Sequence, residues 1–288
     1  MSTRFFSSLG IAICGFLLGC GREPPPPSTT QYLADARSNL SASDFNAALK
    51  NLDRSVKAGG EPALVQQSAA LRTAVVTALA ESSKQLAEAY GAGRKEPAAQ
   101  GQYGAFSTMR ADYYSRARSH LMDAMQSVMD QRRKLGDAPI SLEVSFPGFT
   151  GADDPALAKI KDGHWVGDAE RQGAELKTER NALARTLTTL VGAGVDLNKG
   201  QELFSKGKVD IDPRVYLIES SAAFLRIGGI FDRRGLDELD RLRTVNEVAR
   251  DNMDVALKLL AAKPDKQLEA RAKKMRADCE KTLKALTP

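Results

Sequence analysis

The sequence predicts a mainly α-helical fold: long antiparallel helices in a bundle or an irregular helical array, with one short extended segment near residues 140–146. Three observations predict it. Apolar residues recur at spacings of three and four, glycine and proline cluster between those stretches, and a single segment alternates apolar with polar residues. The 42% hydrophobic and 27% charged residues suit an ordinary globular body.

Residues 1–19 have the features of a signal peptide. Arg4 gives the start a positive charge, and an apolar stretch runs from Leu9 to Leu18. A membrane-spanning helix needs about 20 apolar residues, so this stretch is too short to cross a bilayer comfortably. We therefore expect residues 1–19 to be removed from the mature protein.

The residues Leu17-Leu18-Gly19-Cys20 close the apolar stretch and resemble the lipobox of bacterial lipoproteins. The resemblance implies cleavage before Cys20, a diacylglycerol thioether on its sulfur, and an N-acyl chain such as palmitate on its new amino group. Two or three chains would anchor the protein stably, whereas one binds membranes only marginally. The alternatives are an uncleaved anchor helix and an ordinary secretory leader. Because Gly21 stands where an Asp would resemble an inner-membrane retention signal, the outer membrane is favoured, with the body facing the periplasm.

Residues 20–30 are predicted to be the lipidated cysteine and a proline-rich tether. Four successive prolines, Pro24 to Pro27, favour an extended polyproline II conformation of about 3.1 Å per residue. Such a tether would hold the body about 20–30 Å from the membrane surface.

An N-terminal helical region is predicted over residues 31–135. Ser43 is a candidate N-cap for a helix that ends at Gly59-Gly60, and Pro62 suits the first turn of the next helix. That second helix ends near Gly91-Ala92-Gly93, and a third spans about residues 102–135. Their apolar stripes include Phe45, Ala48, Leu52, Leu71, Val75, Leu79, Leu86, Phe106, Tyr113, Leu121 and Val128.

The segment Asp44-Phe45-Asn46-Ala47-Ala48-Leu49, with Leu52 and Ser55, resembles the second helix of a tetratricopeptide repeat. The resemblance covers about half a repeat, at residues 44–55. In the preceding helix only Ala36 fits the family's pattern, and no second copy follows at a spacing of 34 residues. The two interpretations are a simple helical hairpin and a degenerate repeat scaffold.

An irregular insert rich in glycine and proline is predicted at residues 136–167. Its alternating apolar residues are Ile140, Leu142, Val144 and Phe146. This pattern predicts a short strand that pairs with another, such as Val209-Asp210-Ile211, or an extended loop that lies over the helices. Asp154-Pro155 begins a short helix that ends near Lys161.

A C-terminal helical region is predicted over residues 168–288. Its helices are expected at about 168–191, 199–206, 213–227, 236–262 and 264–286, with Asp212 as one N-cap. Residues 31–288 form either one domain or two helical halves, and the sequence leaves both open.

Charge and cysteine content narrow the classes of function. The net charge of +5 is mild, and basic residues are interleaved with acidic ones, so no nucleic-acid partner is predicted. The densest basic cluster, Arg271, Lys273, Lys274 and Arg276, is interpreted as a solvated helix face; contact with anionic headgroups or cell wall is the alternative.

With Cys14 removed and Cys20 acylated, Cys279 has no disulfide partner. No cofactor is predicted beyond the acyl groups of Cys20.

The candidate pocket lies in the insert, where His164 and the sole tryptophan, Trp165, stand between Asp162 and Asp168. The alternative is a turn in which Trp165 packs inward and Asp168 caps the next helix. No histidine or cysteine pair has the spacing of a zinc site, so no metal ligand is assigned. No nucleotide-binding glycine motif or nucleophile elbow occurs, so no catalytic residue is assigned.

These observations predict a membrane-anchored envelope lipoprotein whose helical body is a scaffold or adaptor for an envelope protein partner. One alternative is a ligand-binding or catalytic module with a pocket near residues 140–168, because functional residues concentrate in loops on rigid scaffolds. Another is an accessory lipoprotein of a secretion or outer-membrane assembly machine.

Overall fold

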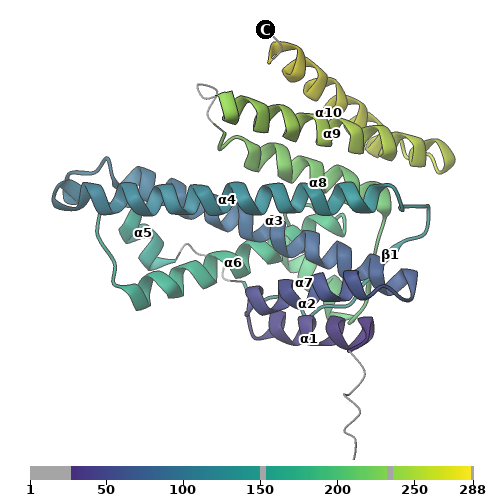
Figure 1. Ribbon diagram of the computed structural model, residues 1–288, viewed down its shortest axis with the longest axis horizontal. Coiled ribbons are helices and arrows are strands. Elements are labelled where there is room, and N and C mark those ends of the chain that lie inside the picture. The colour runs from purple at the N-terminus through teal and green to yellow at the C-terminus, as the bar shows by residue number, and fades with distance from the viewer. Residues whose placement is uncertain (1–26, 150–153, 232–235, 287–288) are drawn as a thin grey trace, which may run out of the picture.

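The computed structural model describes residues 27–149, 154–231 and 236–286 (Figure 1). Within these ranges there are ten α-helices, one short 3-10 helix and a sheet of two three-residue strands. The predicted mainly α-helical fold is therefore confirmed. Across the same ranges, no helix combines the length and the apolar character that crossing a bilayer requires.

The first two helices form a short hairpin, α1 (Thr29–Ser41) and α2 (Phe45–Ala58). α1 begins two residues before the predicted start of the helical region, because the Ser28 side chain accepts a hydrogen bond from the backbone N–H of Gln31. The N-cap of α2 is Asp44 and not Ser43 as predicted, since the Asp44 carboxylate accepts from the backbone N–H of Ala47 at 2.9 Å. Ser43 instead makes the turn, with a left-handed φ of 63°.

A long antiparallel hairpin runs through the middle of the molecule (Figure 1). It consists of α3 (Pro62–Gly93), the 3-10 helix η1 (Pro97–Gln102) and α4 (Tyr103–Arg132). Pro62 occupies the first turn of α3, as predicted. α3 contacts α2, α4 and α6 and is buried on most sides. Its small side chains let these helices approach closely; the buried alanines are Ala69, Ala70, Ala74, Ala78, Ala80, Ala87 and Ala89.

The two strands pair antiparallel, β1 (Ile140–Leu142) with β2 (Val209–Ile211). Ile140 lies opposite Ile211, and both side chains are buried. This pairing confirms the strand interpretation of the alternating segment. β1 also lies against α3, so its apolar face joins the core. The backbone N–H and C=O groups of β1 form hydrogen bonds with β2.

Three helices follow the insert: α5 (Pro155–Lys161), α6 (Asp168–Leu190) and α7 (Leu197–Ser205). α5 and the start of α6 cover the ends of α3 and α4 that lie farthest from α2, and a small apolar cluster forms there. Its aromatic members are Tyr90, Phe106 and Tyr113.

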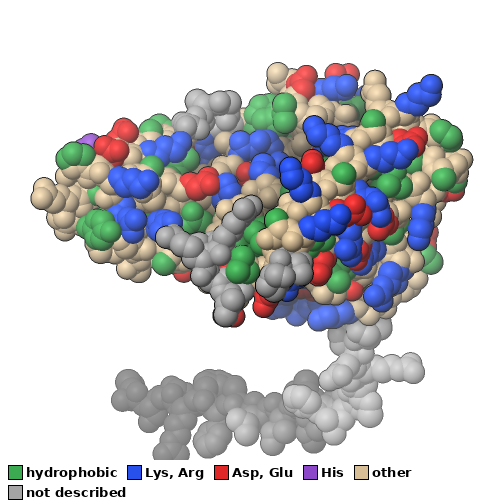
Figure 2. Space-filling view, turned by 90° about the horizontal axis from the view of Figure 1, so that it is seen from above, with side chains coloured by type: hydrophobic (Ala, Val, Ile, Leu, Met, Phe, Trp, Pro, Cys, Tyr) green, Lys and Arg blue, Asp and Glu red, His purple; other side chains and the backbone are tan. Residues whose placement is uncertain are grey.

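The last three helices stack in sequence: α8 (Pro213–Gly228), α9 (Leu236–Ala262) and α10 (Lys266–Ala285). α8 packs on α4 and α9, and α10 packs chiefly on α9, so the stack leads away from the central hairpin (Figure 1). Figure 2 views this side and shows Lys and Arg interleaved with Asp and Glu. Arg271 pairs with Glu219, Lys273 with Glu269, and Arg276 with Asp254. The arrangement is a layered helical array.

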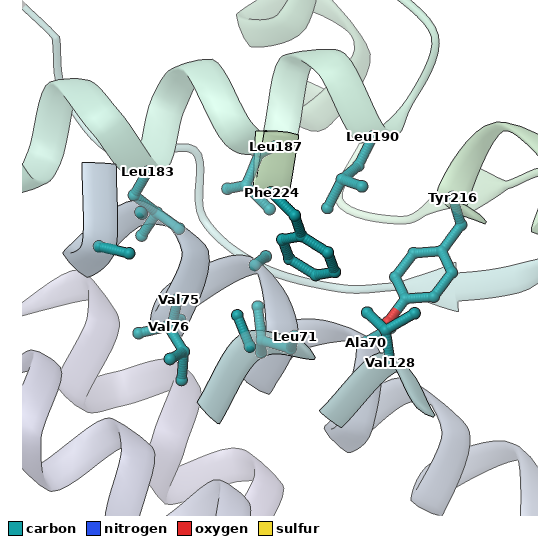
Figure 3. Close-up of a cluster of buried hydrophobic side chains, with 14 of the residues drawn as sticks. Ala70, Leu71, Val75, Val76, Val128, Leu183, Leu187, Leu190, Tyr216 and Phe224 are labelled. Atoms are coloured by element: carbon teal, nitrogen blue, oxygen red, sulfur yellow. The ribbon is translucent and has the colours of Figure 1, made fainter. Parts of the chain in front are cut away.

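One large hydrophobic cluster contains residues from both helical regions (Figure 3). In its centre, Leu71 and Val75 of α3 face Leu187 of α6 and Phe224 of α8. All four side chains are almost fully buried. The N-terminal and C-terminal helices therefore share this core and stabilise each other through it.

Candidate functional site

The candidate pocket predicted in the insert does not assemble around its four residues. Asp162 caps the end of α5, and His164 is exposed. Trp165 is 38% exposed and packs edge-on against Phe106, with ring centroids 5.7 Å apart. Asp168, at the start of α6, forms an ion pair with Arg171. None of the four lines any of the three hollows described below.

The lipidation residues Leu17, Leu18, Gly19 and Cys20 lie outside the described residues. The first helix that the structure describes, α1, is held against the end of α2. The Thr29 hydroxyl donates to the backbone carbonyl of Gly59, and Ser55 donates to the carbonyl of Thr29 at 3.2 Å. The first turn of α1 is thus fixed beside the end of α2, next to Gly60.

A groove lies between α2 and α4, with α3 as its floor, and we call it the α2–α4 groove. Its volume is about 580 Å³. It is lined by Asp53, Val56, Lys57, Gly60, Pro62, Val65, Gln66, Ala69, Arg72, Gln126, Ser127, Asp130, Gln131 and Lys134. A volume of 300–1,000 Å³, apolar walls and a few convergent polar groups are typical of binding sites.

The apolar surface of the groove comes from α2 and from the first half of α3. Val56 and Val65 are partly exposed, and Pro62 is exposed. Ala69 lies deeper, and its small side chain keeps the floor open. α3 packs on both α2 and α4, and the gap between these two helices leaves this part of α3 uncovered.

The floor of the groove also contains a buried polar network. The Gln131 Nε2 donates to Thr73 Oγ1 at 3.0 Å, and Ser127 and Thr73 share a hydrogen bond of 2.7 Å. Tyr216 of α8 donates to the same Thr73 oxygen. The Gln131 Oε1 has no hydrogen-bond partner among the described residues, although the side chain is only 6% exposed. The buried network thus fixes the Gln131 side chain beneath the groove and leaves one of its polar atoms unsatisfied.

The rim of the groove is charged, and its two ends differ. At one end Asp53 and Arg72 form an ion pair of 2.5 Å. At the other end, next to Gly60, the exposed Lys57 and Lys134 have no ion-pair partner among the described residues. Asp130 accepts a hydrogen bond from Gln126 at 2.8 Å. Asp130 keeps its negative charge, but among the lining residues near Gly60 the two lysines outnumber this one carboxylate.

A second hollow, of about 370 Å³, is polar and lies between α4 and α6 at the α1–α2 turn. Its lining residues include Ser43, Asp44, Asn46, Ser83, Arg116, His120, Glu175 and Glu179. Glu175 accepts hydrogen bonds from Arg116 at 2.9 Å and from Tyr113, and Arg180 donates to Ser43 Oγ at 2.6 Å. We call it the polar hollow.

Two groups in the polar hollow have shifted pKa values. Burial, with a smaller contribution from the neighbouring carboxylate of Glu175, raises the pKa of Glu179 to about 7. Burial also lowers the pKa of His120, which favours the neutral imidazole. Shifted pKa values of this kind occur at functional sites and also at structural ones. No polar contact joins a nucleophile to a base here, so the hollow is not assigned a reaction.

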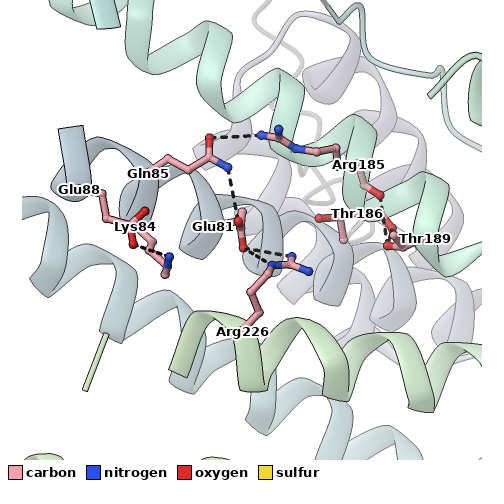
Figure 4. A network of polar contacts seen from close by, with 8 residues as sticks. All are labelled: Glu81, Lys84, Gln85, Glu88, Arg185, Thr186, Thr189 and Arg226. Atoms are coloured by element: carbon pink, nitrogen blue, oxygen red, sulfur yellow. Dashed lines mark hydrogen bonds and ion pairs between the residues drawn. The ribbon is translucent and has the colours of Figure 1, made fainter. Parts of the chain in front are cut away.

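A third, smaller hollow of about 150 Å³ is bordered by a polar network that joins three helices (Figure 4). Glu81 of α3 accepts from Arg226 of α8 at 3.1 Å, and Gln85 accepts from Arg185 of α6 at 3.2 Å. These contacts cross-link α3, α6 and α8, and their role is structural.

No metal site or reactive thiol is found in the described part of the chain. No group of three or more His, Cys, Asp or Glu side chains there is placed to hold a metal ion. Cys279 is buried between α9 and α10, and burial raises the pKa of its thiol to about 11.

Comparisons with known protein families, with curated proteins and with solved structures found no match to this chain.

The groove was not predicted from the sequence. Its apolar residues sit on the same periodic stripes as core residues, so spacing alone does not mark them as uncovered. The sequence feature that could have indicated the groove is a pair of lysines, Lys57 and Lys134. Each lies just beyond an apolar stripe at a helix end. Their proximity depends on how α2 and α4 pack on α3, which the pattern does not specify.

Proposed function

We propose that this chain is an envelope lipoprotein, anchored through Cys20, whose helical body is an adaptor that binds a protein partner in the α2–α4 groove. The groove is the observation that carries the proposal. It is an open apolar channel with a charged rim, and amphipathic helices bind in grooves of this kind through residues at spacings of three and four.

The expected anchor would keep the groove close to the membrane. Eight residues separate Cys20 from Thr29, and a fully extended chain spans at most about 3.6 Å per residue. The first turn of α1 would thus lie within about 30 Å of the acylated sulfur. Because Thr29 contacts the Gly60 end of the groove, a partner held in the same membrane could reach it.

The shape of the molecule is compatible with an adaptor. The N-terminal end of α1 and the α9–α10 stack lie on opposite sides of the central hairpin (Figure 1). A partner in the groove and a second contact on the stack would not compete for the same surface. We favour the outer membrane and a periplasm-facing body, as the sequence around Cys20 suggests.

The anchoring part is tested by fractionating cells that produce the full chain and its Cys20→Ser variant. We expect the wild type in the membrane fraction, with a mass that includes acyl chains on the mature N-terminus. The variant should lose the acyl mass. An unmodified Cys20 in the wild type would refute lipidation.

The binding part is tested with Val65→Glu, which places a carboxylate in the groove, and with Ala270→Glu as a matched control on the exposed face of α10. Each full chain is purified from native membranes after mild crosslinking. A partner that co-purifies with wild type and control but not with Val65→Glu would support the proposal. A partner retained by all three would place binding elsewhere.

A further inference from the structure

The chemistry of the α2–α4 groove specifies what kind of partner segment fits it. The eight residues from Val65 to Arg72 of α3 are separated by seven steps of 1.5 Å, so they cover about 10 Å, or about two helical turns. The occupant of the groove is therefore a short segment. The ion pair between Asp53 and Arg72 borders one end, and Arg72 also donates to the backbone carbonyl of Asp123.

A solvent-accessible amide in the floor argues against a purely apolar occupant. The partly exposed Gln66 of α3 lines the groove and its side chain makes no hydrogen bond to another described residue, so an acyl chain laid over it would remove water from its amide without replacing the hydrogen bond. A polypeptide segment can place one donor, such as a Gln, Asn or Ser side chain, among its apolar residues. The floor thus favours a polypeptide over a lipid.

The charges at the Gly60 end favour acidic groups on the occupant. Lys57 lies in the last turn of α2, and Lys134 lies two residues beyond the end of α4. Both are exposed and have no ion-pair partner within the described ranges, and together they outnumber the one nearby lining carboxylate, Asp130. Carboxylates on the occupant would complement these two cations.

We propose that the α2–α4 groove binds a two-turn amphipathic helix of a partner protein. The helix has a hydrogen-bond donor in its apolar face and acidic residues at the end that meets Lys57 and Lys134. This inference rests on the proposed adaptor function and names the class of its partner. It also gives the charged end of the groove a role in specificity.

The test uses two fluorescent helical peptides as probes and the full anchored chain in lipid nanodiscs. Both peptides have the same leucine face with one central Gln, and they differ only in carrying Glu or Lys at the end of the helix. We expect the Glu peptide to bind about tenfold more tightly than the Lys peptide at low salt, because it exchanges two repulsions for two exposed ion pairs.

Two double variants locate the effect. In Lys57→Glu/Lys134→Glu the preference for the Glu peptide should be lost or reversed. In Lys274→Glu/Lys281→Glu on α10, a matched change of charge away from the groove, the preference should stay. Circular dichroism of both variants should match the wild type, because all four lysines are exposed.

The outcomes separate this inference from the adaptor function. Equal binding of the two peptides, or tighter binding of the Lys peptide, overturns the inference. So does displacement of both peptides by oleate alone, which would make the groove a lipid site. If neither peptide binds while Val65→Glu still removes a co-purifying partner, the adaptor function stands and this description of its partner is wrong.

Discussion

The hydroxyl of Tyr216 on α8 donates a hydrogen bond to Thr73 Oγ1 on α3, at 3.0 Å, and both side chains are almost completely buried. Thr73 also contacts Ser127 and Gln131, which line the α2–α4 groove. The C-terminal helical region is therefore joined through a single polar network to the floor of a groove built by the N-terminal helices.

Replacing Tyr216 with Phe should test this connection. The variant keeps the ring and removes the buried hydroxyl, so the free energy of unfolding should fall by about 1–2 kcal/mol. Urea denaturation measures the change. Tyr103→Phe is the control, because Tyr103 is 56% exposed and should change the same quantity by less than about 0.5 kcal/mol. Equal effects of the two variants would argue against a stabilising network.

Two glycine-to-alanine substitutions should have opposite effects on stability. At Gly93, at the end of α3, a Cβ would lie 1.8 Å from the backbone oxygen of Ile160, so Gly93→Ala must push α5 away. We expect a loss of about 2–3 kcal/mol. At Gly173, within α6, a Cβ would meet nothing within 4 Å, so Gly173→Ala should add about 0.5–1 kcal/mol by favouring the helix. Thermal unfolding measures both changes. A Gly93→Ala variant as stable as the wild type would contradict the packing of α5 on α3.

The raised pKa of Glu179 makes stability depend on pH. In the folded chain its pKa is about 7, above the ordinary value of 4.5, so the folded state holds this proton more tightly than the unfolded state. Glu179 thus favours folding most at low pH, and this contribution is lost as pH rises from about 4.5 through about 7. Glu179→Gln should be more stable than wild type at pH 8, by about 1–2 kcal/mol after allowance for solvent screening, and similar to it at pH 5.

The comparison is made by thermal unfolding at both pH values. His120 faces the same hollow and titrates in both proteins, so the difference between them reports mainly on Glu179. Glu202→Gln, an exposed change on α7, serves as the control. A difference between Glu179→Gln and wild type that did not vary with pH would show that Glu179 has no raised pKa.

Counting thiols should test lipidation of Cys20 and burial of Cys279 together. The mature chain isolated from membranes should show no thiol that reacts with a disulfide reagent while folded, because Cys279 is buried and its pKa is raised to about 11. One thiol should react after unfolding. A reactive thiol in the folded chain, and two after unfolding, would show that Cys20 carries no acyl group.

Most of the fold could be predicted from local patterns, and the reasons are visible in particular residues. Pro62, Pro155 and Pro213 each begin a helix where predicted, because proline suits a first turn. The pairing of β1 with β2 was one of two interpretations, based on the need of one strand for a partner, and the register of Ile140 with Ile211 was not predicted. The cap at Asp44 was missed because Ser43 and Asp44 are both good caps, and only backbone geometry separates them.

The candidate site depended on tertiary arrangement and was not predicted. His164 and Trp165 were predicted to line a pocket because of their residue types. In the structure the ring of Trp165 packs on Phe106 and borders none of the three hollows. The α2–α4 groove exists because α2 and α4 pack on different parts of α3, a relation between residues about 70 positions apart in the sequence. Periodicity within one helix carries no information about such a gap.

The central claim is that the α2–α4 groove binds a protein partner, and site-specific photocrosslinking in cells tests it most directly. A photoreactive amino acid is placed in the full anchored chain at Val65 or Gln66 in the groove, and at Ala270 or Ala277 on the exposed face of α10. We predict that both groove positions give an adduct with the same membrane protein and that the α10 positions do not. An adduct shared by all four positions, or none at Val65 and Gln66, would contradict the claim.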